Sequence, residues 1–438
     1  MASTNNYPRV LLVLMTKVKA EDPCNLLIRT EFGEWPKDHL AQIHALGDPA
    51  GYGELCGRYY RLQTCDRFLG GLFRRLRGSV FEMVADDEVE GPIGATPAGL
   101  LRCWGRVIKK RIGDWLIGSG LWEVIFRVRL SKPMEQFIDD FNPDLIYCQG
   151  YSLGFATLPL LISRRFNIPI CFQTTDDWPW HTYRKSPVGC LLRRKARRLV
   201  IEAKVRMAFG EKMRQVYEKR YQRPFLLTYH ADRFERFPQK GIGVGPAHRS
   251  IVFTGSLGLR RYEAINDLLQ AVRSIDSGAL SMEIHAYCSG IPKDVPEVLR
   301  TAPEVRFLPL PSHDALPSAL ARADVLFLPE SFSIGSGMIE LSLSTKCHLY
   351  MMSGIPILVY GPTHSGTVDY AIQEGWAAVV NERNVEHLGA TLKKLLVDSQ
   401  FVDRIVRRAR EVAKGNHDLF ASRRTFLDIL RGACDGHA

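Results

Sequence analysis

The sequence predicts an α/β protein built from two open parallel-sheet domains in series, and three observations support this prediction. The chain has 438 residues, which corresponds to two or three domains at roughly 100–200 residues per domain. Strand-length apolar segments alternate with helix-length segments in both halves of the chain, which is the spacing of βαβ units. A Gly- and Pro-rich stretch at 238–249 (PQKGIGVGPAHR) interrupts this alternation, and we place the domain boundary there.

The first half is expected to open with a buried parallel strand at Arg9–Met15 (RVLLVLM), because a short apolar run suits a strand covered on both faces. Leu40, Ile43 and Leu46 then follow at three-residue intervals, which predicts a helix. No G-x-G-x-x-G sequence follows the first strand, which argues against a conventional dinucleotide site there. Later strands are expected at 144–148, 168–174 and 204–209, with a helix at 153–166.

The second half repeats the alternation from Ser250 onward and ends in helices from Asn384. Strands are expected at 250–257, 281–287, 305–310, 324–329, 355–360 and 377–380, and helices at 262–272, at 313–323 and up to Gly354. Two such sheets in series favour a ligand cleft between them that faces the carboxyl ends of the strands.

Composition and charge exclude several classes of protein. Hydrophobic residues make up 46% of the chain and charged residues 24%, so collagen-like and wholly disordered chains are excluded. The apolar run Val10–Met15 is too short for a membrane span or a secretory signal. The ten cysteines lack metal-site spacing and are expected to be free thiols in a reducing, cytoplasmic compartment. The net charge of +11 predicts anionic partners such as nucleotides or phospholipid headgroups.

A series of local motifs occurs in a fixed order over most of the chain. In the first half these are FNPDLIYCQGY (141–151), FNIPICFQTTDDW (166–178) and the segment 207–237. In the second half they are VFTGSLGLRRYEAINDLLQAV (252–272), STKCHLYMMSGIPILVYGP (344–362) and EGWAAVV (374–380). Together they resemble the glycosyltransferases of the GT-B fold, especially the large retaining superfamily that uses nucleotide-activated sugars.

The resemblance implies two Rossmann-like domains with a cleft between them and a helical C-terminal segment. It implies an acceptor-binding domain at 1–240 with a basic helical insert around 70–135, a nucleotide-sugar-binding domain at 250–415, and a helix at 416–438 that packs back on the first domain. The implied activity is transfer of a sugar, of the hexosyltransferase type, from a nucleotide diphosphate donor to a hydroxyl of a glycan or lipid-linked glycan in surface polysaccharide synthesis. We expect no cofactor and no metal ion, because no Asp-x-Asp occurs in a strand-end loop.

Two loops of the second half are candidate donor sites, because backbone amides and cations stabilise the negative charges of a diphosphate. After the strand at 324–329, Gly335 and Gly337 would let backbone amides approach a phosphate, Ser336 offers a hydroxyl, and Lys346 supplies a mobile charge. The other candidate loop contains Gly255, Ser256, Gly258, Arg260 and Arg261. We favour Arg261 over its neighbour for the leaving group, because two adjacent side chains cannot point the same way. For the loop with Lys346, the alternative is a flexible loop with a solvated lysine, and for the two arginines it is that one of them merely faces solvent.

The sequence departs from the family at the position that usually contacts the nucleotide ribose. Many retaining members carry two glutamates there, where this sequence has Leu341 and Leu349. Ribose recognition is therefore assigned to Glu330 or Glu340, or else the donor site is altered. An ordinary exposed helix carboxylate is the alternative role for Glu340.

Asp176 and Asp177 directly follow the strand at 168–174, which places them at the rim of the cleft as candidate catalytic residues. A carboxylate there would take the proton from the acceptor hydroxyl in an inverting enzyme, and would position the acceptor in a retaining one. Both roles stay open. So does a structural role, in which the pair caps the next helix or binds Arg184 and Lys185.

A basic and aromatic segment at 101–132 contains eight Lys or Arg residues, two acidic residues and three tryptophans. Its apolar spacing predicts an amphipathic pair of helices. Together with the basic run 193–198 (RRKARR), this segment suits an anionic membrane surface, which predicts peripheral attachment to the inner face of the cell membrane. The alternative is that its aromatic face packs on the first sheet. Nucleic acid is not expected as a partner, because no recognised motif accompanies the charge.

Two other functions stay open at this point. A nucleotide-sugar epimerase on the same scaffold would convert a donor with no acceptor present. A catalytically silent relative that binds glycan or serves as an assembly partner is suggested by the leucine at position 349.

Overall fold

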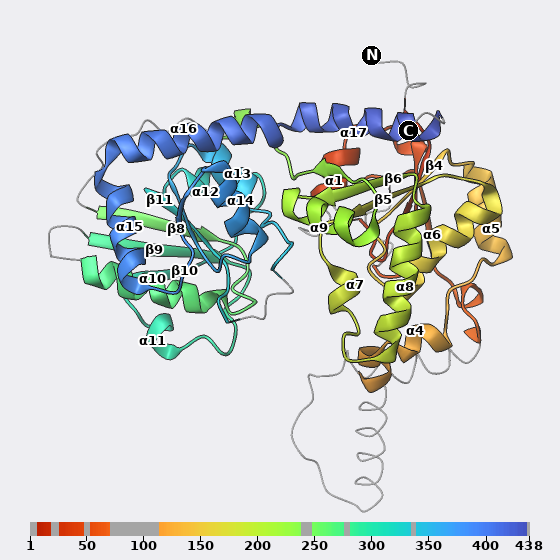
Figure 1. Ribbon diagram of the computed structural model, residues 1–438, viewed down its shortest axis with the longest axis horizontal. Helices are drawn as coiled ribbons and strands as arrows, with labels where there is room; N and C mark the ends of the chain where they lie inside the picture. Colours follow the sequence, from red (N-terminus) through yellow and green to blue (C-terminus); the bar gives the residue numbers. More distant parts are fainter. Residues whose placement is uncertain are drawn as a thin grey trace, which may run out of the picture.

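The computed structural model describes residues 7–18, 26–47, 53–70, 114–237, 248–275, 281–333 and 339–435. In these ranges the chain forms two parallel β-sheets, each flanked by helices, which lie side by side along the long axis of the molecule (Figure 1). The expected α/β class with two Rossmann-like domains is confirmed.

The N-terminal sheet has seven strands in the order β3-β2-β1-β4-β5-β6-β7. They are β1 (Val10–Val13), β2 (Leu40–His44), β3 (Arg58–Arg61), β4 (Leu145–Cys148), β5 (Ile170–Thr174), β6 (Val205–Phe209) and β7 (Leu226–Thr228). Every residue of β1, β4 and β5 is buried, because helices cover both faces of the sheet. The strand order reverses between β1 and β4, which is where open α/β sheets bind ligands.

The helix predicted from Leu40, Ile43 and Leu46 is wrong, because this segment contains β2, which pairs in parallel with β1. Leu40 and Ile43 are fully buried, whereas Leu46 is exposed. Gln42 lies between them, is also fully buried, and donates a hydrogen bond from Nε2 to the Thr16 carbonyl at 2.9 Å. Because the strand is buried although it contains polar residues such as Gln42, its apolar residues recur at a three-residue spacing that is typical of a helix.

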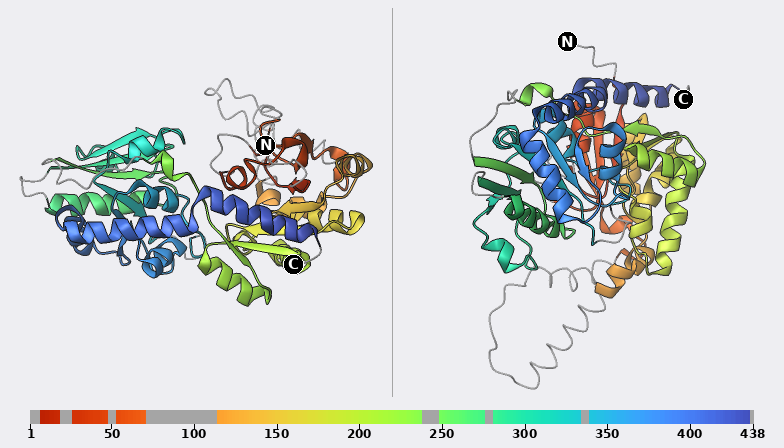
Figure 2. Two further views of the ribbon diagram at one scale, coloured as in Figure 1. Left: turned by 90° about the horizontal axis from the view of Figure 1, so that it is seen from above. Right: turned by 60° about the vertical axis from the view of Figure 1, so that its left-hand side comes forward.

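Helices cover both faces of the N-terminal sheet (Figure 2). The helices in this half of the chain are α1 (Leu26–Phe32), α4 (Leu121–Ile125), α5 (Lys132–Phe141), α6 (Leu153–Phe166), α7 (Trp178–His181), α8 (Pro187–Glu202) and α9 (Glu211–Tyr221). Local capping sets their bounds. For example, the Ser152 hydroxyl accepts a hydrogen bond from the Phe155 amide at the start of α6, and Asn167 ends that helix in the left-handed conformation.

The C-terminal sheet has six strands in the order β10-β9-β8-β11-β12-β13. They are β8 (His248–Thr254), β9 (Ser281–Cys288), β10 (Val305–Pro309), β11 (Val325–Pro329), β12 (Ile357–Tyr360) and β13 (Ala378–Val380). The helices are α10 (Arg261–Ile275), α11 (Glu297–Arg300), α12 (Leu316–Leu320), α13 (Cys347–Ser353), α14 (Gly366–Glu374) and α15 (Val385–Val397). The strand order reverses between β8 and β11, so the loops after these strands lie at the switch point of this sheet.

Two long helices at the end of the chain run along both domains (Figure 1). The first, α16 (Ser399–Asn416), packs on α13 and α15, and the second, α17 (Leu419–Cys434), packs on α1. Phe426 of α17 meets Phe32 of α1 edge to face, with ring centroids 5.0 Å apart. The chain therefore returns from the C-terminal domain to the N-terminal domain near His417.

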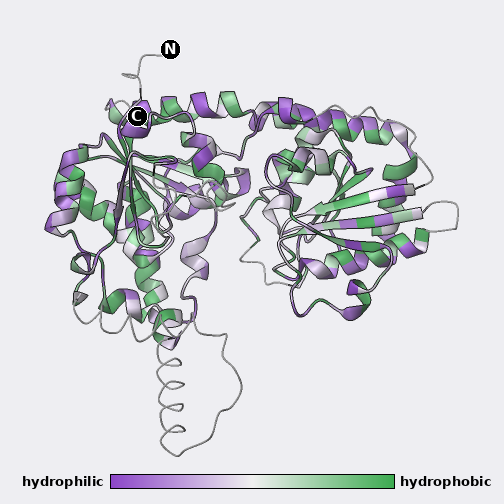
Figure 3. Cartoon of the chain, turned by 180° about the vertical axis from the view of Figure 1, so that it is seen from behind, coloured by the Kyte–Doolittle hydropathy of each residue, from purple (hydrophilic) through white to green (hydrophobic). Residues whose placement is uncertain are grey.

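The cores of both domains are apolar, and polar residues line the outer faces of the helices (Figure 3). No helix in the described ranges combines the length and hydropathy that crossing a membrane requires. The cysteines in these ranges are all free thiols.

Candidate functional site

The carboxyl ends of β8 and β11 lie side by side, because these neighbouring strands pair in parallel. β8 leads into α10, which begins at Arg261, and Glu330 directly follows β11. Arg261 donates hydrogen bonds from Nη2 and Nε to Glu330 Oε2 at 3.0 and 3.3 Å. The structure thus brings these two predicted site residues together at the switch point of the C-terminal sheet.

The carboxylate of Glu330 also holds the start of α14. Its Oε1 accepts a hydrogen bond from Thr367 Oγ1 at 3.0 Å, and Thr367 Oγ1 accepts one from the Ser344 amide at 3.0 Å. Gly361, which follows β12, lets the chain there pack closely against Glu330, because a Cβ on this glycine would lie 2.7 Å from Glu330 Cβ. Sequence analysis missed Thr367. Its place shortly after β12, the neighbour of β11, is the signal that could have indicated it.

Lys346 lies against the turn that follows β8. A Cβ on Gly255 would lie 3.1 Å from Lys346 Nζ, and Gly255 has a φ of +124°, so this position requires glycine. Burial lowers the pKa of the Lys346 ammonium to about 8, as does the charge of Arg261, while the carboxylate of Glu330 raises it. The ammonium is therefore still largely protonated at pH 7. Two cations and one carboxylate share this part of the molecule.

The structure separates Arg260 from Arg261. Arg260 has a left-handed backbone conformation with a φ of 56°, is exposed, and pairs with Glu263 in the first turn of α10. Ser256 is engaged within its own turn, where its Oγ accepts a hydrogen bond from the Gly258 amide at 3.0 Å. Gly255 and Arg261 thus face Lys346 and Glu330, whereas Arg260 and Ser256 have partners nearer to themselves.

The remaining residues of the predicted donor site are Gly335, Ser336, Gly337 and Glu340. Gly335, Ser336 and Gly337 lie outside the described residues. Glu340 is half-buried in the segment between β11 and α13. Leu349 is buried in α13, a helix in which every residue is buried, so an apolar side chain suits its position.

Asp177 is buried at the start of α7 and binds α9 of its own domain. Arg220 donates to its two carboxylate oxygens at 2.6 and 3.0 Å, and Tyr217 donates to Oδ1 at 2.9 Å. A bidentate pair of this kind fixes the geometry of both side chains. The partner of this aspartate is therefore Arg220, rather than the Arg184 or Lys185 considered from sequence.

Asp176 is exposed and faces the C-terminal domain. Its Oδ1 accepts a hydrogen bond from Ser342 Oγ at 2.8 Å, and its Oδ2 accepts one from Tyr151 Oη at 3.1 Å. At the same interface, Lys212 Nζ donates to the His364 carbonyl at 2.9 Å. All these residues follow carboxyl ends of strands, so the carboxyl edges of the two sheets face one another.

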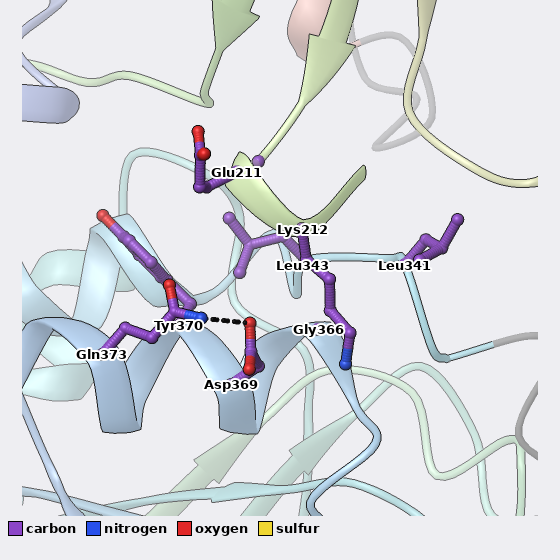
Figure 4. Close-up of a pocket in the computed structure, with 9 residues that line it drawn as sticks. Glu211, Lys212, Leu341, Leu343, Gly366, Asp369, Tyr370 and Gln373 are labelled. Atoms are coloured by element: carbon purple, nitrogen blue, oxygen red, sulfur yellow. Dashed lines mark hydrogen bonds between the residues drawn. The ribbon is translucent and has the colours of Figure 1, made fainter. Parts of the chain in front are cut away.

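A small hollow lies between α9 and α14 at this interface (Figure 4). It is lined by Gly210, Glu211, Lys212, Leu341, Leu343, Gly366, Asp369, Tyr370 and Gln373. Figure 4 shows side chains of both domains meeting around it. The cluster of Arg261, Glu330 and Lys346 lies outside its lining.

A second group of titratable residues, which sequence analysis missed, lies where the chain passes between the domains. The rings of His230, His348 and His417 stack in a column, with centroids 5.6 Å apart for the first pair and 5.9 Å for the second. We call these three residues the histidine stack. They do not converge on a common point, and within the described ranges no group of three or more His, Cys, Asp or Glu side chains is arranged to hold a metal ion.

Comparison with known proteins establishes the fold. No family model and no curated protein matches this sequence. Among solved structures, the chain is similar to sucrose-phosphate synthase from Thermosynechococcus elongatus, with 12% identity, coverage of 98% of this chain and 100% of that chain, and a TM-score of 0.62. It is similar to Anabaena HepE in complex with UDP, with 12% identity, coverage of 97% and 100%, and a TM-score of 0.62.

A third similar structure, from Listeria monocytogenes, is assigned as a UDP-N-acetylglucosamine 2-epimerase. It shares 11% identity, with coverage of 98% of this chain and 97% of that chain, and a TM-score of 0.54. These similarities show that the chain has the GT-B fold expected from its sequence motifs.

Proposed function

We propose that this protein is a glycosyltransferase of the hexosyltransferase type, which moves a sugar from a nucleotide diphosphate donor to a hydroxyl acceptor. The observation that carries the proposal is the placement of Arg261 and Lys346 around one carboxylate, Glu330, at the switch point of the C-terminal sheet. Two cations and one carboxylate leave an excess of positive charge, which suits an anionic diphosphate. In support, HepE, which shares the fold, has been seen in complex with UDP-glucose.

In the proposed reaction, the acceptor oxygen forms a bond to the anomeric carbon, the bond between that carbon and the diphosphate oxygen breaks, and the diphosphate leaves with increased negative charge. A guanidinium such as that of Arg261 donates to two phosphate oxygens at once, and an ammonium such as that of Lys346 adds a compact charge. Preorganised charges of this kind stabilise a leaving group as it forms. The proposed chemistry requires no cofactor or metal ion beyond the donor itself.

We place the acceptor hydroxyl near Asp176. This carboxylate contacts Ser342, which lies four residues before Lys346, so one segment of the C-terminal domain connects the acceptor side to the donor side. Asp176 would take the acceptor proton if the reaction inverts the anomeric configuration. If the reaction retains it, Asp176 would position the acceptor, and the acceptor proton would pass to the leaving diphosphate. Asp177 is proposed to support this loop through its pair with Arg220.

We further propose a glycan or lipid-linked glycan as acceptor, and an anionic membrane surface as the place where the protein acts. Trp115 is 62% exposed near α4, although Trp122 is buried against Phe126. A hydrogen bond of 2.5 Å between Tyr183 and Glu123 ties α4 to the segment between α7 and α8. Along α8 the exposed residues include Arg194, Arg197 and Arg198. Sedimentation with anionic vesicles at low salt and its loss at high salt would test this placement.

A panel of nucleotide sugars, assayed for release of free nucleoside diphosphate, tests the proposed reaction. We expect one donor to release diphosphate faster when a glycan or lipid-linked acceptor is added. No release from any donor, with or without acceptor, would favour the catalytically silent relative.

The similar structure assigned as an epimerase favours a second candidate, a nucleotide-sugar epimerase. An epimerase would convert its donor without an acceptor and would give an isomeric nucleotide sugar as product. Analysis of the products from the same panel therefore separates the two candidates.

A further inference from the structure

Glu330 is the anion of the donor-side cluster, and both of its carboxylate oxygens are engaged. Oε2 accepts from Arg261, and Oε1 accepts from Thr367. The side chain is 4% exposed, and that of Arg261 is 15% exposed. A ribose hydroxyl therefore has little access to this carboxylate, so the geometry does not favour the ribose contact expected from sequence.

Glu330 also reduces the repulsion between the two cations of the cluster. Arg261 and Lys346 are like charges in a partly buried site, where their repulsion is stronger than it would be in water. The charged groups that act on the Lys346 ammonium are Arg261, which disfavours its charged form, and Glu330, which favours it. The neighbouring Cys347 is an uncharged thiol, because burial raises its pKa. Removing the carboxylate would leave the two cations to repel each other.

The Thr367 hydroxyl extends this control to the segment that carries Lys346. Thr367 donates to Glu330 and accepts from the Ser344 amide, two residues before Lys346. One carboxylate thus contacts Arg261 directly and reaches the Lys346 segment through a single intervening side chain.

We propose that Glu330 is a positioning residue, which holds the Arg261 guanidinium in place and supplies the counter-charge that lets Arg261 and Lys346 share one diphosphate site. This inference rests on the proposed donor site. It makes an unusual prediction, because removing a negative charge from an anion site would ordinarily tighten anion binding. If Glu330 positions the cations, its removal weakens binding instead.

Inorganic pyrophosphate is the probe for a calorimetric titration of the full chain at pH 7. We expect Glu330→Gln to weaken pyrophosphate binding at least tenfold. The matched control is Glu304→Gln, which removes a bidentate pair with Arg273 in the same domain. Glu304 directly precedes β10 and so lies at the opposite edge of the sheet from Glu330. This control is expected to bind pyrophosphate as the wild type does.

A double-mutant cycle identifies the residue through which Glu330 acts. In a chain that already carries Arg261→Ala, we expect Glu330→Gln to cost much less than tenfold, because the side chain that it positions is gone. Thr367→Val, which removes the hydroxyl that holds Oε1, is expected to weaken binding by a smaller factor. This second variant keeps the inference testable if Glu330→Gln does not fold.

The pH dependence gives a readout that a merely structural role would not change. Glu330 raises the pKa of Lys346, so without this carboxylate Lys346 loses its proton at a lower pH. The ratio of wild-type to Glu330→Gln affinity should therefore grow from pH 6 to pH 8, and pyrophosphate's own titration cancels in that ratio.

The outcomes separate this inference from the proposed function. No saturable binding of pyrophosphate by the wild type would overturn the proposed donor site and the role of Glu330 with it. Wild-type binding that Glu330→Gln leaves unchanged or tightens would overturn the positioning role alone. A tenfold loss that is equally large with and without Arg261 would do the same.

Discussion

The donor-side cluster and the histidine stack deal with buried titratable groups in opposite ways. In the cluster, Glu330 accepts hydrogen bonds from Arg261 and raises the pKa of Lys346, so Lys346 is largely protonated at pH 7. In the stack, burial lowers the pKa of His230 to about 3 and that of His417 to about 4, so the rings are neutral at pH 7. His417 contacts the His230 carbonyl at 2.6 Å through Nδ1 and the Tyr370 hydroxyl at 3.0 Å through Nε2.

The difference shows where this molecule keeps charge in its interior. Burying charge is costly unless a partner compensates it. The rings of the histidine stack carry no charge, so their burial avoids the cost of desolvating a charged group. The donor-side cluster carries more positive charge than its single carboxylate balances, and such an excess is useful where an anion binds.

Lowering the pH gives the largest expected change in the free energy of unfolding, and it tests whether the histidine stack is neutral at pH 7. A histidine whose pKa is lower in the folded chain binds a proton first in the unfolded chain, so stability falls as pH drops from about 6.5 toward 4. Each histidine of the stack contributes about 1.4 kcal/mol per pH unit within that window. Urea unfolding at pH 7 and at pH 5 should show the loss, and His348→Phe should reduce its slope. A slope that is the same in this variant would contradict the account.

The second-largest effect is expected at the Asp177–Arg220 pair, which is a buried charged pair outside the proposed donor site. Asp177→Asn leaves Arg220 without its bidentate partner, and we expect it to lower the free energy of unfolding by about 3 kcal/mol. Asp176→Asn changes an exposed carboxylate and should cost less than about 1 kcal/mol of stability while slowing sugar transfer. Urea unfolding of both variants is the measurement. Equal losses of stability would show that the two aspartates do not differ as described.

Lys346→Ala tests the donor-side cluster in an activity assay. We expect the rate of diphosphate release to fall by about 100-fold, because a charge that stabilises the leaving group is removed. Lys393→Ala, on the exposed face of α15, is the matched control and should leave the rate unchanged. An undiminished rate in Lys346→Ala would remove this lysine from the proposed site.

The smallest effect is expected at Glu31. Burial favours the uncharged form of this acid, as it does for the histidines of the stack. Burial raises its pKa to about 8, although Gln173 Nε2 donates to its Oε1 at 2.6 Å. Its folded form keeps the proton that the unfolded form loses, so wild-type stability falls as pH rises from about 4.5 to 8.

Glu31→Gln removes this pH dependence. We expect the variant to be more stable than the wild type by about 2 kcal/mol at pH 6 and of similar stability at pH 4.5. Thermal unfolding at the two pH values checks this, with Glu34→Gln on the nearby surface as the control. Lower stability of Glu31→Gln at pH 6 would show that the carboxylate is ionised and satisfied in the core.

Much of the fold could be predicted, because parallel strands covered on both faces leave continuous apolar runs such as that of β1. The failure at β2 has a physical cause. Gln42 is buried there with a hydrogen bond to the carbonyl of Thr16, 26 positions away in the chain, and such a partner is not visible in a local pattern.

The site was less predictable, because its contacts join segments far apart in the chain. The turn after β8 pointed to Arg261 and Arg260, but only the structure shows that the first meets Glu330 and the second turns to Glu263. Thr367 lies 37 positions from Glu330. The histidine stack combines three such distant positions, and nothing in the residues around each histidine indicates the other two.

Calorimetric titration with UDP, GDP and ADP tests most directly whether the C-terminal domain holds a nucleotide diphosphate through Arg261 and Lys346. The account predicts saturable binding of at least one nucleotide by the wild type, weakened at least tenfold in both Arg261→Ala and Lys346→Ala. No saturable binding of any of the three, or binding that neither substitution changes, would contradict it.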